Sequence, residues 1–339
     1  MRVLLVSYAF APSIGGVETA SLILAAELRR RGHEVAVATA TQAASPPAFD
    51  YPVHYQPSPW RLMALHRWAD VVLHNGFSLR FAWPLPLVRR PWVVVHASDF
   101  RPGFLRRLIA RAARHISVSS DVALTVPLPS TVVPNAYRTD VFSKRNDGAR
   151  RYRFGFVGRL VSDKGAAHLL EALARLTGAG EFARCTIVGA GPEEERLREQ
   201  ARTLGLEERV DFLGVRRETE LAAVLNEIDC LVVPSIWNEP FGIVALEGIA
   251  CGCVVIGSQG GGLKDAIGPC GLTYPNGDVA ALAAAMQRIL SEPGLTAELR
   301  RHAGAHLARH TPRAVVDAYL AVMARALGDR RVHGKPALG

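Results

Sequence analysis

Short apolar runs alternate with longer amphipathic segments along the whole chain. In the first half, the apolar runs predict strands at 3–7, 35–39, 71–74, 93–96, 116–119 and 131–133. In the second half, they predict strands at 154–158, 185–189, 210–213, 230–233, 254–257 and 271–274. Runs of Val, Leu and Ile without polar alternation are typical of parallel strands that are buried on both faces. The pattern therefore predicts an α/β protein with two doubly wound parallel-sheet domains.

The chain length and one polar interruption give the domain boundaries. The 339 residues are enough for two domains, each with its own core. The polar segment Arg138–Arg151 is the expected linker between them. We therefore expect an N-terminal domain over 1–145 and a C-terminal domain over 151–310. The basic residues near the end of the chain predict a flexible tail at 329–339.

Composition indicates a soluble globular protein with reduced cysteines. Hydrophobic residues make up 49% of the chain and charged residues 21%, which is the balance of an ordinary soluble domain. No apolar run reaches the roughly 18 residues of a transmembrane helix, and the N-terminus has no signal-peptide pattern. The five cysteines show no metal-ligand spacing, so we expect no metal site. We expect a cytoplasmic protein, at the cytoplasmic face of the membrane if it docks there.

The net positive charge lies entirely in the first half of the chain. Residues 1–150 contain 18 basic and 9 acidic residues, whereas residues 151–339 contain 22 of each. Such an excess favours anionic partners. The segment 101–114 is predicted to be a helix with a basic face opposite an apolar stripe. The arginines that we expect to contact an anionic acceptor or an anionic membrane are Arg106, Arg107, Arg111 and Arg114. The alternative is a basic face that is only solvated.

The stretch 230–252 combines a strand, a loop and a helix in a pattern that suits a sugar nucleotide. Its apolar run ends at Pro234, and a helix is predicted from Ile243 to Cys251. The start of a helix offers free N–H groups and partial positive charge to a phosphate. Glu239 in the loop and Glu247 in the helix can accept hydrogen bonds from sugar hydroxyls. A lone glutamate is more often a solvated surface residue, so the other loops decide between the two readings.

Other predicted strand ends supply glycines, cations and a histidine. Gly15 and Gly16 precede the first helix and let backbone N–H groups approach a ligand closely. Arg159 and Lys164 follow the strand at 154–158, and both side chains suit phosphate oxygens. His96 ends another strand, at the sheet edge where ligands of such folds bind.

Taken together, these motifs occur in a characteristic order and spacing. They are Gly15-Gly-Val-Glu18, His96, Val133-Pro-Asn135, Gly158-Arg-Leu160, Lys164-Gly165, Gly189-Ala-Gly-Pro192, Phe212-Leu-Gly214, Pro234-Ser235, Glu239-Pro-Phe-Gly242, Glu247, Ala250-Cys-Gly252 and Gly260-Gly-Gly262. In this combination the chain resembles the retaining GT-B glycosyltransferases of glycosyltransferase family 4 over residues 1 to 328. The resemblance implies two Rossmann-like domains that face a cleft, with a last helix at 311–328 crossing back onto the N-terminal domain.

The resemblance also implies roles for individual residues. Arg159 and Lys164 would hold the donor diphosphate, and the amide of Gly16 would close on it from the N-terminal domain. Glu239 would engage the hydroxyls of the donor sugar, and His96 would lie beside that sugar. The other implied donor contacts are the amides of Phe241, Gly242 and Ile243, the carboxylate of Glu247 on the ribose, and the backbone of Gly214 and Val215 at the base.

The implied reaction is transfer of a sugar from a nucleoside-diphosphate sugar to an acceptor hydroxyl with retention of configuration. Protein cations would stabilise the leaving diphosphate, so no cofactor and no metal is expected. We expect a glycan or lipid-linked acceptor of cell-envelope biosynthesis. Two alternatives remain: a GT-B epimerase or phosphorylase, and a basic binding protein without enzymatic activity. Nucleic acid is not expected as a partner, because aromatic residues do not interleave with the basic ones.

Overall fold

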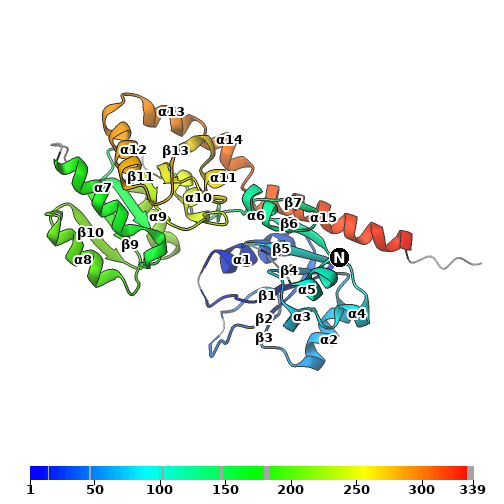
Figure 1. The fold of residues 1–339 in the computed structure, drawn as a ribbon. Helices are drawn as coiled ribbons and strands as arrows, with labels where there is room; N and C mark the ends of the chain where they lie inside the picture. The colour runs from blue at the N-terminus through cyan, green and yellow to red at the C-terminus, as the bar shows by residue number, and fades with distance from the viewer. Residues whose placement is uncertain are drawn as a thin grey trace, which may run out of the picture. The chain divides into compact units, whose positions relative to one another are not determined.

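The computed structural model describes residues 1–13, 15–45, 47–98, 100, 103–145, 148–178 and 183–333. The chain divides into two compact units: unit 1 comprises Met1–Ala136 with Pro312–Gly339, and unit 2 comprises Tyr137–Thr311. Each unit is built on one parallel sheet with helices packed against it (Figure 1). The prediction of two doubly wound parallel-sheet domains is therefore confirmed.

Unit 1 contains a seven-stranded sheet in the order β3-β2-β1-β4-β5-β6-β7. Its strands are β1 (Arg2–Ser7), β2 (Glu34–Thr39), β3 (Val53–Tyr55), β4 (Val71–Asn75), β5 (Trp92–His96), β6 (Arg114–Ser117) and β7 (Ser130–Val132). Its helices are α1 (Gly16–Arg30), α2 (Pro59–Trp68), α3 (Leu79–Ala82), α4 (Leu85–Val88), α5 (Phe104–Ala110), α6 (Ser120–Thr125) and α15 (Pro312–His333). One core cluster lies between the central strands and α2, α3 and α4.

Unit 2 contains a six-stranded sheet in the order β10-β9-β8-β11-β12-β13. Its strands are β8 (Tyr152–Val157), β9 (Cys185–Val188), β10 (Val210–Gly214), β11 (Ile228–Val233), β12 (Val254–Ser258) and β13 (Gly271–Tyr274). Its helices are η1 (Ser162–Lys164), α7 (Ala166–Gly178), α8 (Glu194–Thr203), α9 (Glu218–Asn226), α10 (Ile243–Ala250), α11 (Leu263–Ile267), η2 (Gly268–Cys270), α12 (Val279–Ser291), α13 (Leu295–Arg301) and α14 (Ala303–Ala308). Its core lies between the sheet and helices that include α7, α8 and α12.

Three local differences from the expected elements lie in unit 1. The short edge strand β3 was not expected, because its three residues are only half-buried and give no apolar run. Strand β6 begins at Arg114, two residues before the expected run, because it pairs with β5 from Val93 onward. The single helix expected over 101–114 is wrong: α5 ends at Ala110, and Arg114 already belongs to β6. Residues 101 and 102 lie outside the described residues.

The division between the units also differs from the expected boundary. Unit 2 begins at Tyr137, so the segment before β8 belongs to unit 2 and not to the N-terminal domain. The reason is a set of hydrogen bonds to α9: the Arg145 amide donates to Asn226 Oδ1 at 2.7 Å, and Asn226 Nδ2 donates to the Ser143 carbonyl at 3.0 Å. Side-chain amides that satisfy backbone groups hold this segment onto unit 2.

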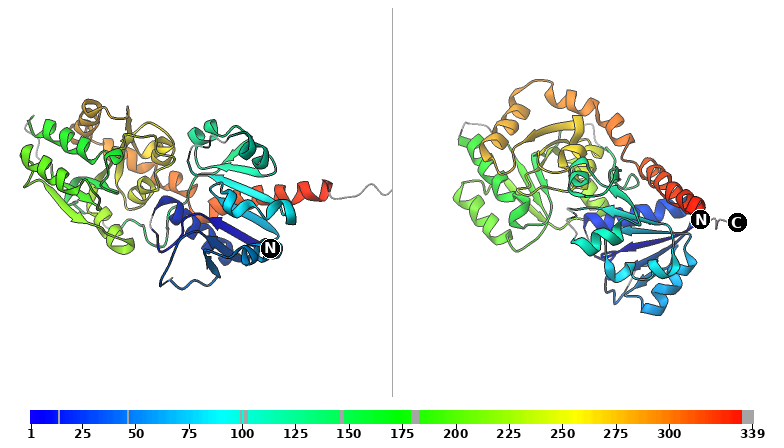
Figure 2. Two further views of the ribbon diagram at one scale, coloured as in Figure 1. Left: turned by 60° about the horizontal axis from the view of Figure 1, so that its bottom comes forward. Right: turned by 45° about the vertical axis from the view of Figure 1, so that its right-hand side comes forward.

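The last helix, α15, belongs to unit 1 and contacts α1 and β5 (Figure 2). Arg31 at the end of α1 forms an ion pair with Asp317 at 2.5 Å and donates to the Arg313 carbonyl at 2.6 Å. The helix continues to His333 and so includes the first residues of the tail expected from residue 329. The flexibility of that tail stays a prediction. Residues 334–339 lie outside the described residues.

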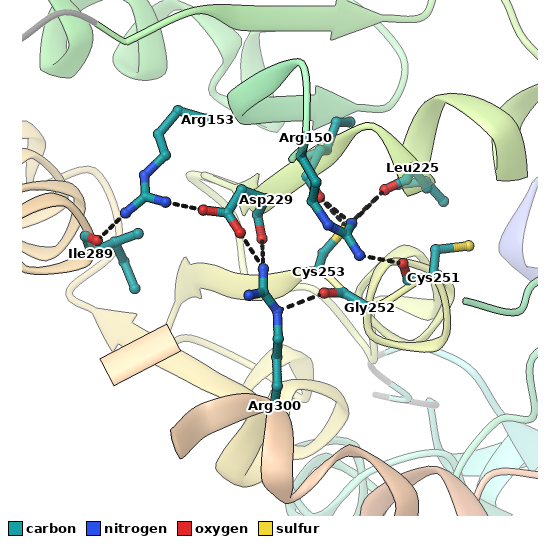
Figure 3. A network of polar contacts seen from close by, with 10 residues as sticks. Arg150, Arg153, Leu225, Asp229, Cys251, Gly252, Cys253, Ile289 and Arg300 are labelled. Carbon is teal, nitrogen blue, oxygen red and sulfur yellow. Dashed lines mark hydrogen bonds and ion pairs between the residues drawn. The ribbon is translucent and has the colours of Figure 1, made fainter. Parts of the chain in front are cut away.

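A buried carboxylate holds together the amino ends of the unit 2 strands (Figure 3). Asp229, near the start of β11, is 8% exposed. It forms ion pairs with Arg153 of β8 through Oδ2 and with Arg300 of α13 through Oδ1. Arg300 Nε also donates to the Gly252 carbonyl at 2.9 Å. Both arginines are about one-third exposed, so the network is a partly buried triad on the side of the sheet opposite the carboxyl-end loops.

Candidate functional site

The loops that leave the carboxyl ends of the unit 2 strands form the candidate site. Strands β8 and β11 are neighbours in the sheet, although β9 and β10 separate them in the sequence. The chain therefore reverses its direction of winding between β8 and β11, and ligands of doubly wound sheets bind at such a point. The loop after β8 carries Arg159 and Lys164, and the loop after β11 carries Glu239. The strand order thus brings the predicted cations and carboxylate to one edge.

Glycines allow these loops to meet backbone against backbone. Gly165 has φ +71°, and a Cβ atom there would overlap the Pro234 carbonyl. Gly261 has φ +73°, and a Cβ atom there would overlap the Glu239 carbonyl. The Gly262 amide donates to the same carbonyl at 2.7 Å. Positive φ and close backbone contact both require glycine at positions 165 and 261, so both residues fix the position of the loop after β11.

Lys164 and Glu239 form an ion pair at the centre of this arrangement. Glu239 is only 7% exposed, and Lys164 Nζ donates to its Oε1 atom. Ser235 Oγ donates to the same oxygen at 2.7 Å. Lys164 Nζ also lies 5.3 Å from the centre of the Trp237 ring, in a cation–π contact. Both hydrogen bonds use Oε1, so the Oε2 atom has no hydrogen bond to any described residue and can still accept one.

A side chain that sequence reasoning missed braces the same loop. Asn276, after β13, accepts a hydrogen bond from the Gly260 amide at 2.7 Å. Its Nδ2 atom lies 3.2 Å from the Ile236 carbonyl and 3.1 Å from the Trp237 carbonyl. Asn276 therefore ties the glycine run after β12 to the loop after β11. No local signal identified it, because a Pro-Asn-Gly sequence alone predicts only a turn.

Two further residues that were predicted to bind the sugar nucleotide have ionisable side chains without a hydrogen-bonding partner among the described residues. Neither Arg159 nor Glu247 forms a hydrogen bond or ion pair of its side chain with a residue in the described ranges. Arg159 is exposed after β8, whereas Glu247 is half-buried on α10. Burial raises the pKa of the Glu247 carboxyl to about 7, and the positive charge of Arg138 opposes this rise. A carboxyl whose pKa is near 7 is partly protonated at neutral pH, so it can both donate hydrogen bonds to ribose hydroxyls and accept hydrogen bonds from them.

The predicted backbone contacts also lie at strand ends of unit 2. Helix α10 begins at Ile243, which agrees with the predicted start, and its N-cap residue is Gly242 with φ +93°. Phe241 is buried, and no side chain caps the helix, so its first N–H groups are not consumed by a capping side chain. Gly214 ends β10, and Val215 follows it as an exposed residue.

Gly16 and His96 belong to unit 1. Gly16 is the first residue of α1, whose N-cap Gly15 makes no side-chain cap. His96 is the last residue of β5 and is 3% exposed. Its Nε2 atom lies 2.9 Å from Nδ1 of His115 on β6, a contact that sequence reasoning missed. Both residues therefore occupy the carboxyl ends of the unit 1 strands, as their sequence positions predicted.

The predicted basic surface is exposed, but its apolar side chains are not all packed. Phe104 and Leu108 of α5 are 86% and 51% exposed, whereas Ile109 packs against the core. The exposed arginines of this region are Arg106, Arg107, Arg111 and Arg114. The apolar stripe opposite the basic face is therefore only partly packed, and aromatic, aliphatic and basic side chains share one exposed segment; whether the basic face is only solvated stays open.

The described residues contain neither a grouped metal-ligand set nor a membrane-spanning helix. Within those ranges, no three His, Cys, Asp or Glu side chains are grouped so that they could hold a metal ion. No helix of the described chain is both long and apolar enough to cross a membrane. The five cysteines all lie within the described residues, where they are buried and form no disulfide.

Comparisons with known proteins agree with the motifs. The model of the family "Glycosyl transferases group 1" matches residues 138–306. The chain is 38% identical to a glycogen synthase of Mycobacterium tuberculosis over 259 residues, which are 69% of this chain and 61% of that protein. It is 30% identical to a D-inositol 3-phosphate glycosyltransferase of Stackebrandtia nassauensis over 324 residues, which are 86% of this chain and 72% of that protein.

A solved structure of Anabaena HepE in complex with UDP superposes with a TM-score of 0.80 at 21% identity, covering 96% of this chain and 100% of HepE. The chain spans less than two thirds of the glycogen synthase, which is among the first curated relatives that it matches. The match to the inositol phosphate glycosyltransferase, however, covers 72% of that protein, and the family model matches this chain as well. These two findings identify the family. The chain therefore belongs to the glycosyl transferases group 1 family and has the GT-B fold that its motifs predicted.

Proposed function

We propose that the protein transfers a sugar from a nucleoside-diphosphate sugar to an acceptor hydroxyl with retention of anomeric configuration. The observation that carries the proposal is the ion pair of Lys164 with Glu239, with Arg159 exposed in the same loop as Lys164. This arrangement offers cations to a diphosphate and a carboxylate oxygen to sugar hydroxyls within one set of loops. HepE, a structural neighbour, was solved with UDP and with UDP-glucose, which supports this class of donor.

The proposed step breaks the bond between the anomeric carbon and the diphosphate oxygen. Negative charge grows on the leaving diphosphate, where Arg159 and Lys164 stabilise it electrostatically. The acceptor oxygen bonds to the anomeric carbon on the same face, and its proton passes to the leaving phosphate oxygen. We infer that no metal ion is required, because these side chains and the start of α10 supply the positive charge. No carboxylate is assigned as a covalent nucleophile.

The first test measures donor binding and turnover together. One nucleoside-diphosphate sugar of a panel should raise the unfolding midpoint of the full chain, because a ligand at 100 times its Kd stabilises the folded state by about 2.7 kcal/mol. With that donor and a cell-envelope glycolipid extract, release of the nucleoside diphosphate should depend on the extract and persist in excess EDTA. Release without acceptor, or epimerised donor without release, would favour the epimerase alternative. Complete loss on chelation, restored by magnesium or manganese, would contradict metal independence.

We further propose that the acceptor is anionic or lies at an anionic membrane surface, such as a lipid-linked cell-envelope precursor. The excess positive charge of residues 1–150 supports this, as do the exposed Phe104 and Leu108 among the arginines of α5. Exposed aromatic and aliphatic side chains insert at a lipid interface, while arginines bind its phosphates.

Replacing the four arginines at positions 106, 107, 111 and 114 by Gln should weaken association with anionic liposomes or raise the acceptor KM. Each arginine near an acidic bilayer contributes on the order of 1 kcal/mol, and the contribution falls at high salt. Binding of the nucleotide sugar should not change. A matched control replaces Arg196, Arg198 and Arg202 of α8 in unit 2, which also removes positive charge. If only the control, or neither variant, reduces association at low salt, the basic segment of unit 1 is a solvated surface.

A further inference from the structure

A buried chain of hydrogen bonds leads from a helix end to His96. The carbonyl of Ala110, the last residue of α5, lies 3.0 Å from Nε2 of His115. Nδ1 of His115 lies 2.9 Å from Nε2 of His96. Both rings are almost fully buried, and the Phe100 ring packs on His96 with 4.5 Å between ring centres. The three groups therefore form one linear relay within unit 1.

The direction of each hydrogen bond follows from the first acceptor. A carbonyl oxygen can only accept, so His115 Nε2 must carry a proton and donate it. Burial lowers the pKa of both rings, to about 3 for His96, so both rings are neutral near pH 7. A neutral His115 that is protonated at Nε2 has a lone pair at Nδ1, which requires a donor. His96 Nε2 is then the protonated atom, and His96 Nδ1 carries a lone pair.

We propose that His115 is a positioning residue that locks His96 in the Nε2–H tautomer, so that Nδ1 of His96 faces its ligand as a hydrogen-bond acceptor. An uncoupled imidazole exchanges between two tautomers and can present either a proton or a lone pair. The Ala110 carbonyl fixes the tautomer of His115, and His115 in turn fixes the tautomer of His96. In the described part of the chain, no residue bonds to His96 Nδ1, so this lone pair is available.

The consequence for the ligand is a requirement for a donor group. A hydroxyl or an N–H satisfies the lone pair of Nδ1, whereas a carboxylate or an ether oxygen at that position leaves two acceptors facing each other. This consequence rests on the proposed function and on the place beside the donor sugar that the family resemblance implies for His96. The tautomer assignment does not rest on it, because it follows from contacts inside unit 1 alone.

The tautomer is measured directly by nitrogen NMR of the ¹⁵N-histidine-labelled full chain near pH 7. We expect His96 to show a protonated Nε2 and an unprotonated Nδ1. His115→Leu removes the acceptor, so the His96 signals should shift toward a mixture of tautomers. His115→Asn places an amide oxygen near the former Nδ1 position and should preserve the wild-type pattern. A proton on Nδ1 of His96 in the wild-type protein would overturn the assignment, whether or not any leucine variant folds.

The kinetic test uses the donor found in the binding panel. His115→Leu should lower kcat/KM for the donor about tenfold, which is the usual effect of losing one buried hydrogen bond. His115→Asn should recover most of that loss. His66→Leu is the control, since it removes another buried unit 1 histidine that bonds only to the Leu62 carbonyl. A tautomer shift in His115→Leu without loss of kcat/KM would overturn the ligand-facing role. Absence of transferase activity in the wild-type protein would refute the proposed function while the tautomer result stands.

Discussion

Replacing Lys164 by Ala should lower kcat by about two orders of magnitude or more, as removal of a group that stabilises transition-state charge commonly does. The Lys164 ammonium is held between Glu239 and the Trp237 ring, so its position is fixed before a donor arrives. A preorganised charge costs little reorganisation when the diphosphate departs. Because the diphosphate gains charge in the transition state, kcat should fall more than the donor KM rises.

The measurement is steady-state release of nucleoside diphosphate at saturating acceptor. Arg175→Ala is a matched control, because it removes an exposed positive charge from α7 of the same unit. Lys164→Arg keeps the charge but replaces a compact ammonium by a planar guanidinium, so it should recover only part of kcat. Near-wild-type turnover of Lys164→Ala would remove Lys164 from the mechanism. An equally large loss in Arg175→Ala would indicate a general effect of charge.

Asp229→Ala should destabilise unit 2 by on the order of 3 kcal/mol, the lower end of the range for breaking a buried ion pair. The substitution leaves Arg153 and Arg300 facing each other without their shared carboxylate. Partial solvent access to both guanidinium groups keeps the loss from being larger. The network ties β8, β11 and α13 at the amino ends of the strands, so its loss should loosen the whole sheet.

This effect is measured by denaturant unfolding of the full chain, which is monitored with a probe that reports on unit 2. Glu292→Ala provides the control, because it removes a surface carboxylate that pairs with Arg288 on α12 and should leave the midpoint nearly unchanged. Asp229→Asn keeps the shape of the side chain and some of its hydrogen bonds, so its midpoint should lie between those of Asp229→Ala and wild type. Equal midpoints for Asp229→Ala and the control would show that the triad adds no net stability.

The sequence by itself determined the fold class and much of the candidate site. Strands buried on both faces must be apolar along their whole length, so the strands of both sheets other than the half-buried edge strand β3 were predicted from local runs. The sequence also placed Lys164 and Glu239 at one sheet edge, because loops after parallel strands share that edge. The roles of Lys164, Glu239 and Gly16 came from the family resemblance and stay predictions. The start of α10 at Ile243 followed from the proline and glycine that precede it.

The tertiary structure alone decided which side chains meet. Asn276 and His115 have no sequence signal, because each acts across the fold on a loop or strand that is distant in the sequence. The unit boundary at Tyr137 depends on Asn226 satisfying backbone groups more than 80 positions away, where local composition predicted a linker. Helix α5 ended early because β6 had to pair with β5, and pairing with a distant strand overrides local helical periodicity.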